Sequence, residues 1–163
     1  MRHYFAFIAF VITVFVLTSC KEDVVVDPSA AYVGKYNCSL TRKVTKLSGA
    51  NELVETKVYT GEVTKRTERS LELSLTTAQG REGLTIPLML TGEAVVVPQF
   101  VTDSSYTSAG VTTYLSNYYL GNGNLKNKTL SVALNSANFR MVGTTGNQAQ
   151  ISNSDVDCTC VKK

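Results

Sequence analysis

The sequence predicts an all-β domain, an antiparallel up-and-down barrel of eight strands, with a β-sandwich as the alternative. Three observations support this fold class. Apolar and polar residues alternate with a period of two in eight or nine short segments after residue 30. Turn-forming residues separate these segments, and no segment has the 3.6-residue period of an amphipathic helix. Many short strands joined by regular polar turns are typical of antiparallel barrels and sandwiches.

The chain begins with an apolar segment that differs from the rest. Arg2 and His3 precede an uncharged apolar run of fourteen residues, 4–17. A helix needs roughly 20 apolar residues to span a bilayer, so this run has the length of a secretory signal. An ordinary signal peptidase requires small residues one and three positions before the cut, and Leu17 occupies the second of these positions if the cut precedes Cys20. We therefore expect a different peptidase to process the segment.

The four residues that end at Cys20 (LTSC) resemble the bacterial lipobox. This resemblance implies that the Cys20 thiol receives a diacylglycerol and that the chain is cut just before it. The expected organisation is a lipoprotein signal peptide at 1–19, a lipidated tether at 20–29 and a single barrel domain at 30–163. Two or more acyl chains anchor a protein stably, so the membrane is an expected partner. An uncleaved anchor and an ordinary signal peptide are the alternatives.

The three residues after the lipidation site, one basic and two acidic, are relevant to localisation. Lys21, Glu22 and Asp23 resemble the export signal of surface lipoproteins in Bacteroidetes-type bacteria. The resemblance implies an outer-membrane or cell-surface location for the lipid-anchored chain. A solvated tether without a signalling role is the alternative.

Composition limits the functions of the mature chain. Removal of residues 1–19 leaves 15 Lys and Arg against 13 Asp and Glu, a net charge of +2. This balance predicts no nucleic-acid partner, because phosphate binding requires a basic face, and the basic groups that begin at Arg42 and Lys65 are interpreted as solvated strand edges. The only histidine, His3, is also removed, which excludes histidine-based catalysis and histidine metal ligation. We expect no enzymatic activity, no cofactor and no metal site.

A helical turn and a half-buried strand are expected at the start of the domain. Asp27 is the expected N-cap of a turn whose first residue is Pro28. In the strand that follows, the inward-facing positions are Tyr32, Gly34, Tyr36, Cys38 and Leu40. The alternation therefore predicts one apolar and one polar face for this strand.

Further strands are expected at 53–63, 70–76, 84–90, 94–101, 111–120, 125–135, 138–142 and 156–161. Pro87 lacks an N–H group, so its strand should lie at an edge or contain a bulge. Residues 102–110 form the longest polar stretch, which we interpret as a mobile loop. Gly121 and Gly123 flank an asparagine, a pattern that predicts a hairpin turn rather than a phosphate-binding loop.

The opening strand also resembles a known barrel family. Gly34-Lys35-Tyr36 resembles the Gly-x-Trp motif on the first strand of lipocalins, which implies a lipocalin-like barrel in a small Bacteroidetes-type surface lipoprotein. The chain departs from that pattern because Tyr36 replaces the tryptophan, no Thr-Asp-Tyr motif follows, and no helix is expected after the last strand.

Three cysteines remain once Cys20 is lipidated. Cys38 lies on the first expected strand, whereas Cys158 and Cys160 lie on the last. The first and last strands of a closed barrel are neighbours, and disulfides persist in exported proteins, so Cys38 is expected to bond to Cys158 or Cys160. Such a bond would contribute on the order of 4 kcal/mol through loop closure. A reactive or metal-binding pair of Cys158 and Cys160 is the alternative.

Two functions from different classes follow from these observations. An eight-stranded barrel has an interior just wide enough for one small ligand, which predicts a module that binds an apolar or amphipathic molecule. Tyr36, Tyr114 and Tyr118 are the candidate lining residues. The alternative is a barrel packed with Leu and Val that acts as an accessory subunit of a surface complex and contacts its partner through loops such as 102–110. No residues with a catalytic arrangement are found.

Overall fold

The computed structural model describes residues 27–48, 53–92, 94–143 and 146–163. The predicted signal peptide, Cys20 and the tether up to residue 26 therefore lie outside the described residues. Among the residues that are described, no helix has the length and apolar composition needed to cross a membrane.

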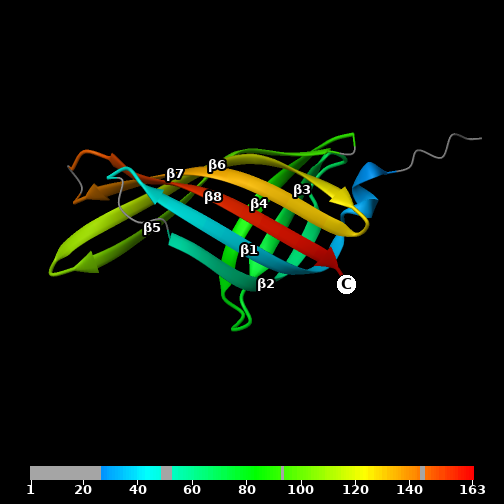
Figure 1. Cartoon of the computed structure of the whole chain (residues 1–163), viewed down its shortest axis with the longest axis horizontal. Coiled ribbons are helices and arrows are strands. Elements are labelled where there is room, and N and C mark those ends of the chain that lie inside the picture. Colours follow the sequence, from blue (N-terminus) through cyan, green and yellow to red (C-terminus); the bar gives the residue numbers. More distant parts are fainter. Residues whose placement is uncertain (1–26, 49–52, 93, 144–145) are drawn as a thin grey trace, which may run out of the picture.

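Eight antiparallel strands form a closed barrel in which each strand pairs with its sequence neighbours and β1 also pairs with β8. The strands are β1 (Gly34–Lys46), β2 (Leu53–Lys65), β3 (Ser70–Thr76), β4 (Glu82–Thr91), β5 (Ala94–Ser108), β6 (Val111–Lys126), β7 (Thr129–Val142) and β8 (Ala149–Lys162). Figure 1 shows β1 beside β8, so the first and last strands close the wall. The up-and-down barrel predicted from the sequence is confirmed.

The two ends of the barrel differ in how they are covered. The short 3₁₀ helix η1 (Pro28–Ala31) lies at the end that also holds the C-terminus, and we refer to this end as the closed end (Figure 1). Asp27 caps η1 by accepting a hydrogen bond from the Ser29 backbone N–H at 2.9 Å, with Pro28 at the first position, as the sequence predicts. The opposite end, where the β5–β6 and β7–β8 connections project, is the open end (Figure 1).

The core fills the closed half of the barrel. Its largest fully buried side chains are Tyr36, Cys38, Val63, Leu71, Leu73, Leu75, Ile86, Leu88, Val95, Leu130, Val132 and Leu134. They come from the inward-facing set of each strand, because successive residues in a strand point to opposite faces. The alternation of β3, which buries Leu71, Leu73 and Leu75, matches the prediction for residues 70–76.

The predicted loop at 102–110 is wrong. Residues up to Ser108 continue β5, which pairs without interruption with β6 from Phe100 opposite Tyr119 to Ser108 opposite Val111. The turn is limited to Ala109 and Gly110, which both have positive φ. The stretch is polar because this hairpin extends past the apolar core, and its side chains are mostly exposed.

The predicted hairpin turn at Gly121 and Gly123 is also wrong, since both residues lie inside β6. A Cβ atom at Gly121 would lie 2.0 Å from the carbonyl oxygen of Ala133, so the close approach of β7 requires glycine there. The turn between β6 and β7 is formed by Asn127 and Lys128, which have φ of 51° and 63°. Two segments predicted as separate strands, 125–135 and 138–142, therefore fall largely into one strand, β7.

Pro87 lies where the barrel wall is only partly hydrogen-bonded. It pairs with Glu72 on β3, whereas β4 pairs with β5 only over Met89–Thr91. The missing N–H of Pro87 therefore falls outside the β4–β5 ladder, in agreement with the edge-like position expected for this strand.

Candidate functional site

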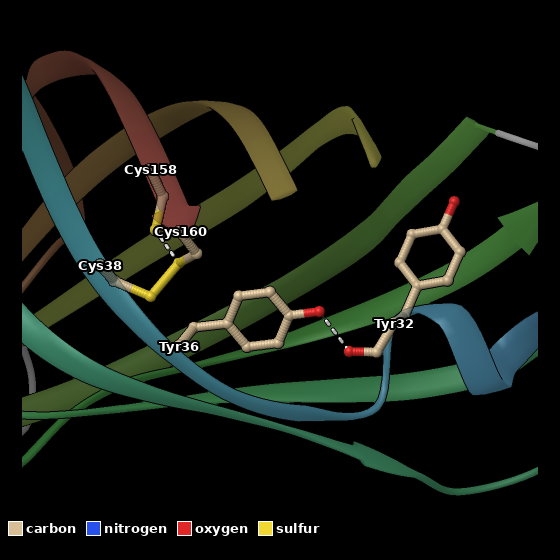
Figure 2. Close-up of a disulfide and its surroundings, with 5 residues drawn as sticks. All are labelled: Tyr32, Tyr36, Cys38, Cys158 and Cys160. Carbon is tan, nitrogen blue, oxygen red and sulfur yellow. Dashed lines mark hydrogen bonds between the residues drawn. A yellow bond between two sulfur atoms is a disulfide. The ribbon is translucent and has the colours of Figure 1, made fainter. Parts of the chain in front are cut away.

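The three tyrosines proposed as ligand-lining residues are not brought together. Tyr36 is fully buried in the core, and its O–H donates a hydrogen bond to the carbonyl oxygen of Tyr32 (Figure 2). Desolvation raises the pKa of Tyr36. On β6, Thr113 and Tyr119 are buried, so the even-numbered Tyr114 and Tyr118 belong to the outer face of the barrel. The sequence does not determine which face of this strand points inward, because both faces carry tyrosine.

The cysteines form a buried cluster on the two strands that close the barrel. Cys38 and Cys160 are directly opposite in the β1–β8 register and form a disulfide, with their Cα atoms 4.0 Å apart. Figure 2 shows Cys158 beside this bond, with its Sγ atom 3.5 Å from the Sγ atom of Cys160. Burial raises the pKa of the Cys158 thiol to about 12, so it stays protonated at neutral pH. The disulfide expected between the first and last strands is confirmed, with Cys160 as the partner of Cys38.

The three sulfur atoms lie within 4.8 Å of one another, a separation that a single metal ion bridges when all three are thiolates. The disulfide uses two of them, so only the Cys158 thiol remains as a ligand in this state. The predicted alternative of a Cys158 and Cys160 pair therefore has one member already bonded to Cys38.

Inside the open half, the barrel interior is polar and centred on Arg42. The Arg42 guanidinium donates hydrogen bonds to Asn138 Oδ1 at 3.2 Å and to Ser154 Oγ at 3.3 Å. The Asn138 amide in turn donates to the hydroxyl oxygens of Ser152 and Ser154, each at 2.9 Å. Asn138, Ser152 and Ser154 are all buried. Hydrogen bonds among these groups offset the cost of removing them from water.

The sequence predicts that Arg42 lies on a solvated strand edge, and the structure contradicts this prediction. Its guanidinium is partly buried and forms the interior contacts described above. The signal that was overlooked is strand parity, since Arg42 has the same parity as the inward-facing Tyr36, Cys38 and Leu40.

A cavity of about 200 Å³ lies between this polar cluster and the apolar core, and we call it the mouth pocket. Four apolar side chains line it: Leu40, Leu84, Tyr119 and Val156. The charged side chains Arg42, Glu55 and Lys57 line it too, and Lys57 Nζ lies 2.7 Å from Glu55 Oε1. The hydrogen bond and the negative charge of Glu55 raise the pKa of Lys57. Arg42 forms no ion pair with a carboxylate among the described residues, although Glu55 is its neighbour in the β1–β2 register.

A larger hollow of about 600 Å³ lies on the outer surface of the barrel over β6, β7 and β8. Tyr118 is among its lining residues. The mouth pocket and this outer hollow share no lining residue. Comparisons with protein-family models, with curated proteins and with solved structures find no significant match to this chain.

Proposed function

We propose that this chain is a lipid-anchored binding module whose mouth pocket takes a small amphipathic molecule with an anionic head group. The observation that carries the proposal is Arg42, a partly buried cation held by neutral partners at the boundary between an apolar and a polar interior. Concave sites that combine apolar walls with a few fixed polar groups are the usual form of small-molecule sites.

The charge of the mouth pocket favours an anion. Arg42 and Lys57 supply two positive charges, whereas Glu55 supplies one negative charge. The guanidinium is already oriented by Asn138 and Ser154, so little side-chain entropy is lost when it binds a carboxylate or a phosphate. A planar carboxylate matches the paired N–H donors of the guanidinium group.

The apolar side chains set the size of the ligand. Leu40, Leu84, Tyr119 and Val156 form the apolar part of a pocket of about 200 Å³, because the core below is filled by large side chains. This volume lies below the roughly 300–1,000 Å³ of drug-sized sites, which favours a short apolar chain over a full-length lipid.

Binding is tested with a series of straight-chain carboxylates, from butanoate to dodecanoate, by isothermal titration calorimetry. Affinity should rise with chain length until the pocket is full and then level off or fall. Arg42→Met should weaken the binding of the best carboxylate about tenfold or more, because a charge-assisted hydrogen bond is lost. The matched control is Lys35→Met, which removes a charge from the same strand on the outer face at the closed end. Equal affinity of both variants would contradict the proposal.

The anchoring part of the proposal rests on Cys20 and is tested separately. Lipidation of Cys20 would tether the barrel to the outer membrane or the cell surface, with the tether separating the domain from the head groups. Cys20→Ala should move the protein from the membrane fraction to the soluble fraction, whereas Cys158→Ala should leave it in the membrane fraction. Retention of the Cys20→Ala protein on membranes would contradict lipid anchoring.

An accessory role in a surface complex remains a second proposal, favoured by the β5–β6 hairpin. Tyr106, Val111 and Tyr114 are large apolar residues on this hairpin, with exposed fractions of 53%, 48% and 37%. A photo-crosslinking residue at position 106 should capture a protein in intact cells if the hairpin is an interface. The same residue at position 58, on the exposed face of β2, is the control, and equal yields at the two positions would contradict this role.

A further inference from the structure

The hollow on the outer surface, which we call the outer groove, is built from two rows of side chains that cross three strands. Tyr118 on β6, Ala137 on β7 and Asn153 on β8 are in register and form the first row. Leu120, Asn135 and Asp155 form the second row in the same way. The small side chain of Ala137 lies at the centre of the first row and leaves space between its larger neighbours.

Two irregularities in strand pairing coincide with this groove. The β5–β6 register shifts between Val97 and Phe100, so two residues of β5, Pro98 and Gln99, face Leu120 on β6. The β7–β8 register shifts between Asn138 and Phe139. Gln99 and Phe139 both line the groove. Bulges are common next to functional sites, and both of these irregularities lie beside the groove.

The aromatic side chains of the groove hold each other in place. The rings of Tyr118 and Phe139 are in edge-to-face contact, with centroids 5.3 Å apart and an interplanar angle of 80°. Such pairs contribute about 0.5–1.5 kcal/mol beyond the burial of their area, so the two rings are preorganised. Both rings line the groove, and their planes are close to perpendicular.

The remaining lining is rich in neutral hydrogen-bonding groups. Four amide side chains, Gln99, Asn135, Gln148 and Asn153, and one carboxylate, Asp155, line the groove, and no Lys, Arg or His does so among the described residues. Each amide both donates and accepts hydrogen bonds. The Asn153 amide is further oriented by Gln150, whose Nε2 donates to Asn153 Oδ1 at 2.7 Å.

From this chemistry we infer that the outer groove binds a neutral oligosaccharide. A sugar ring has apolar C–H faces that stack on aromatic rings and hydroxyl groups that both donate and accept hydrogen bonds, as the amides and Asp155 require. The groove volume of about 600 Å³ lies within the range of small-molecule sites. An anionic ligand is disfavoured because Asp155 would repel it and no cation lines the groove. A purely apolar ligand would leave the amides without partners.

This site is separate from the mouth pocket. Most of its side chains come from the outer face of β6, β7 and β8, whereas the mouth pocket is lined from the inner face by Arg42 and Val156. Ser136 and Ser154 also line the groove although they are buried on the inner face, and Ser154 accepts a hydrogen bond from Arg42. The two cavities share no lining residue. The inference does not depend on the proposed function, because a saccharide bound against Tyr118 and Phe139 would contact no residue that lines the mouth pocket.

The test is saturation-transfer NMR on the full-length protein, purified in a detergent without a sugar head group. The probes are neutral trisaccharides of glucose, mannose, galactose and N-acetylglucosamine, with trigalacturonate as the charged comparison. At least one neutral trisaccharide should bind, and trigalacturonate should bind at least tenfold more weakly than a neutral galactose trisaccharide. Tighter binding of trigalacturonate than of the neutral trisaccharides would overturn the inference. Failure of every neutral probe to bind at concentrations up to about 10 mM would overturn it too.

Variants then assign the binding to the groove. Tyr118→Ala and Phe139→Ala should each weaken the binding of the best trisaccharide at least tenfold. Tyr114→Ala is the matched control, because Tyr114 lies on the same outer face of β6 but does not line the groove, and its affinity should stay within twofold of the wild type. Phe139→Leu keeps an apolar side chain and the fold but removes the ring, so it should weaken binding as well. Unchanged trisaccharide affinity in Tyr118→Ala and Phe139→Leu would overturn the assignment. An equally large loss of affinity in Tyr114→Ala would overturn it too.

Discussion

The closed and open halves of this barrel share the same eight strands but differ in what fills them. In the closed half, the interior is formed by Leu, Val and Ile side chains that are almost completely buried, together with Tyr36 and the disulfide. In the open half, the buried interior residues are Thr113, Ser136, Asn138, Ser152 and Ser154. One half supplies hydrophobic stabilisation, whereas the other holds polar groups in position.

The change from apolar to polar occurs at one level on neighbouring strands. On β7 it falls between Leu134 and Ser136, and on β8 between Val156 and Ser154. The register pairs Leu134 with Val156 and Ser136 with Ser154, so the two transitions are side by side. The boundary of the core therefore lies at the same level on β7 and β8, and the mouth pocket lies at this level next to Val156.

The largest expected effect concerns the disulfide of the closed half. The double variant Cys38→Ala, Cys160→Ala should lower the free energy of unfolding by about 4 kcal/mol, because the bond closes a loop with a sequence separation of 122 residues. Urea unfolding followed by circular dichroism measures the change. Cys158→Ala retains the disulfide and is the control, with an expected loss on the order of 1 kcal/mol from the small cavity. A double variant no less stable than Cys158→Ala would show that the disulfide does not stabilise the barrel.

A second comparison truncates one leucine in each half. Leu73→Ala should lower the free energy of unfolding by about 2–5 kcal/mol, because Leu73 is fully buried in the closed half and its truncation leaves a cavity. Leu115 faces inward on β6 in the open half. Leu115→Ala should lower the free energy of unfolding by less than half as much, because Leu115 is only partly buried. The difference in urea midpoint between the two variants is the measurement, and equal losses would contradict the division of the barrel into two halves.

The polar interior of the open half is tested with Asn138→Ala. This change removes the hydrogen-bond acceptor of Arg42 and the hydrogen-bond donor to Ser152 and Ser154. It should lower the free energy of unfolding by about 1–3 kcal/mol. Asn122→Ala, at an exposed position of β6, should change stability by less than about 0.5 kcal/mol. If both variants were equally stable in urea, the Arg42 cluster would have no structural role.

The smallest effect concerns the connection of η1 to the barrel. Asp27 accepts a hydrogen bond from Lys65 at 2.5 Å, and this contact with Lys65, together with Ser29, lowers the pKa of Asp27 from 3.8 to about 2. Its contribution to stability is therefore present above pH 3.8 and is lost as the pH falls towards 2.

The melting temperatures of the wild type and of Asp27→Asn measure this contribution. Their difference should be small, since the pair is exposed, and it should shrink as the pH is lowered from 7 towards 2. Ser39→Ala, at an exposed position of β1, provides a control for general acid destabilisation. A difference that is constant over this pH range would contradict the assignment.

The alternation of apolar residues predicted most strands because it reports burial directly. Residues 70–76 illustrate this, since every second residue of β3 is buried. The same pattern places Arg42 inside, yet its charge led to a surface interpretation. A cation within the barrel becomes acceptable only when partners such as Asn138 and Ser154 are supplied from distant strands.

Predictions from local composition are wrong where contacts between strands determine the structure. Gly121 and Gly123 have the composition of a turn, but they lie within β6 because β7 approaches too closely for a side chain. Residues 102–110 have the composition of a loop, but continuous pairing with β6 keeps them in β5. In both cases the deciding partner lies on another strand, which a local pattern does not contain.

The amino-acid pattern alone predicts the all-β class, the order of most strands, the capped turn at Asp27 and the proximity of Cys38 to the last strand. These features depend on period, on turn chemistry and on the closure of the barrel, all of which are written along the chain. Contacts between strands determine that Cys160 rather than Cys158 bonds to Cys38, that Tyr114 and Tyr118 face outward, and where the mouth pocket and the outer groove lie. These features depend on register, because a shift of one residue moves a side chain from the interior to the surface, and a shift of two residues would place Cys158 opposite Cys38.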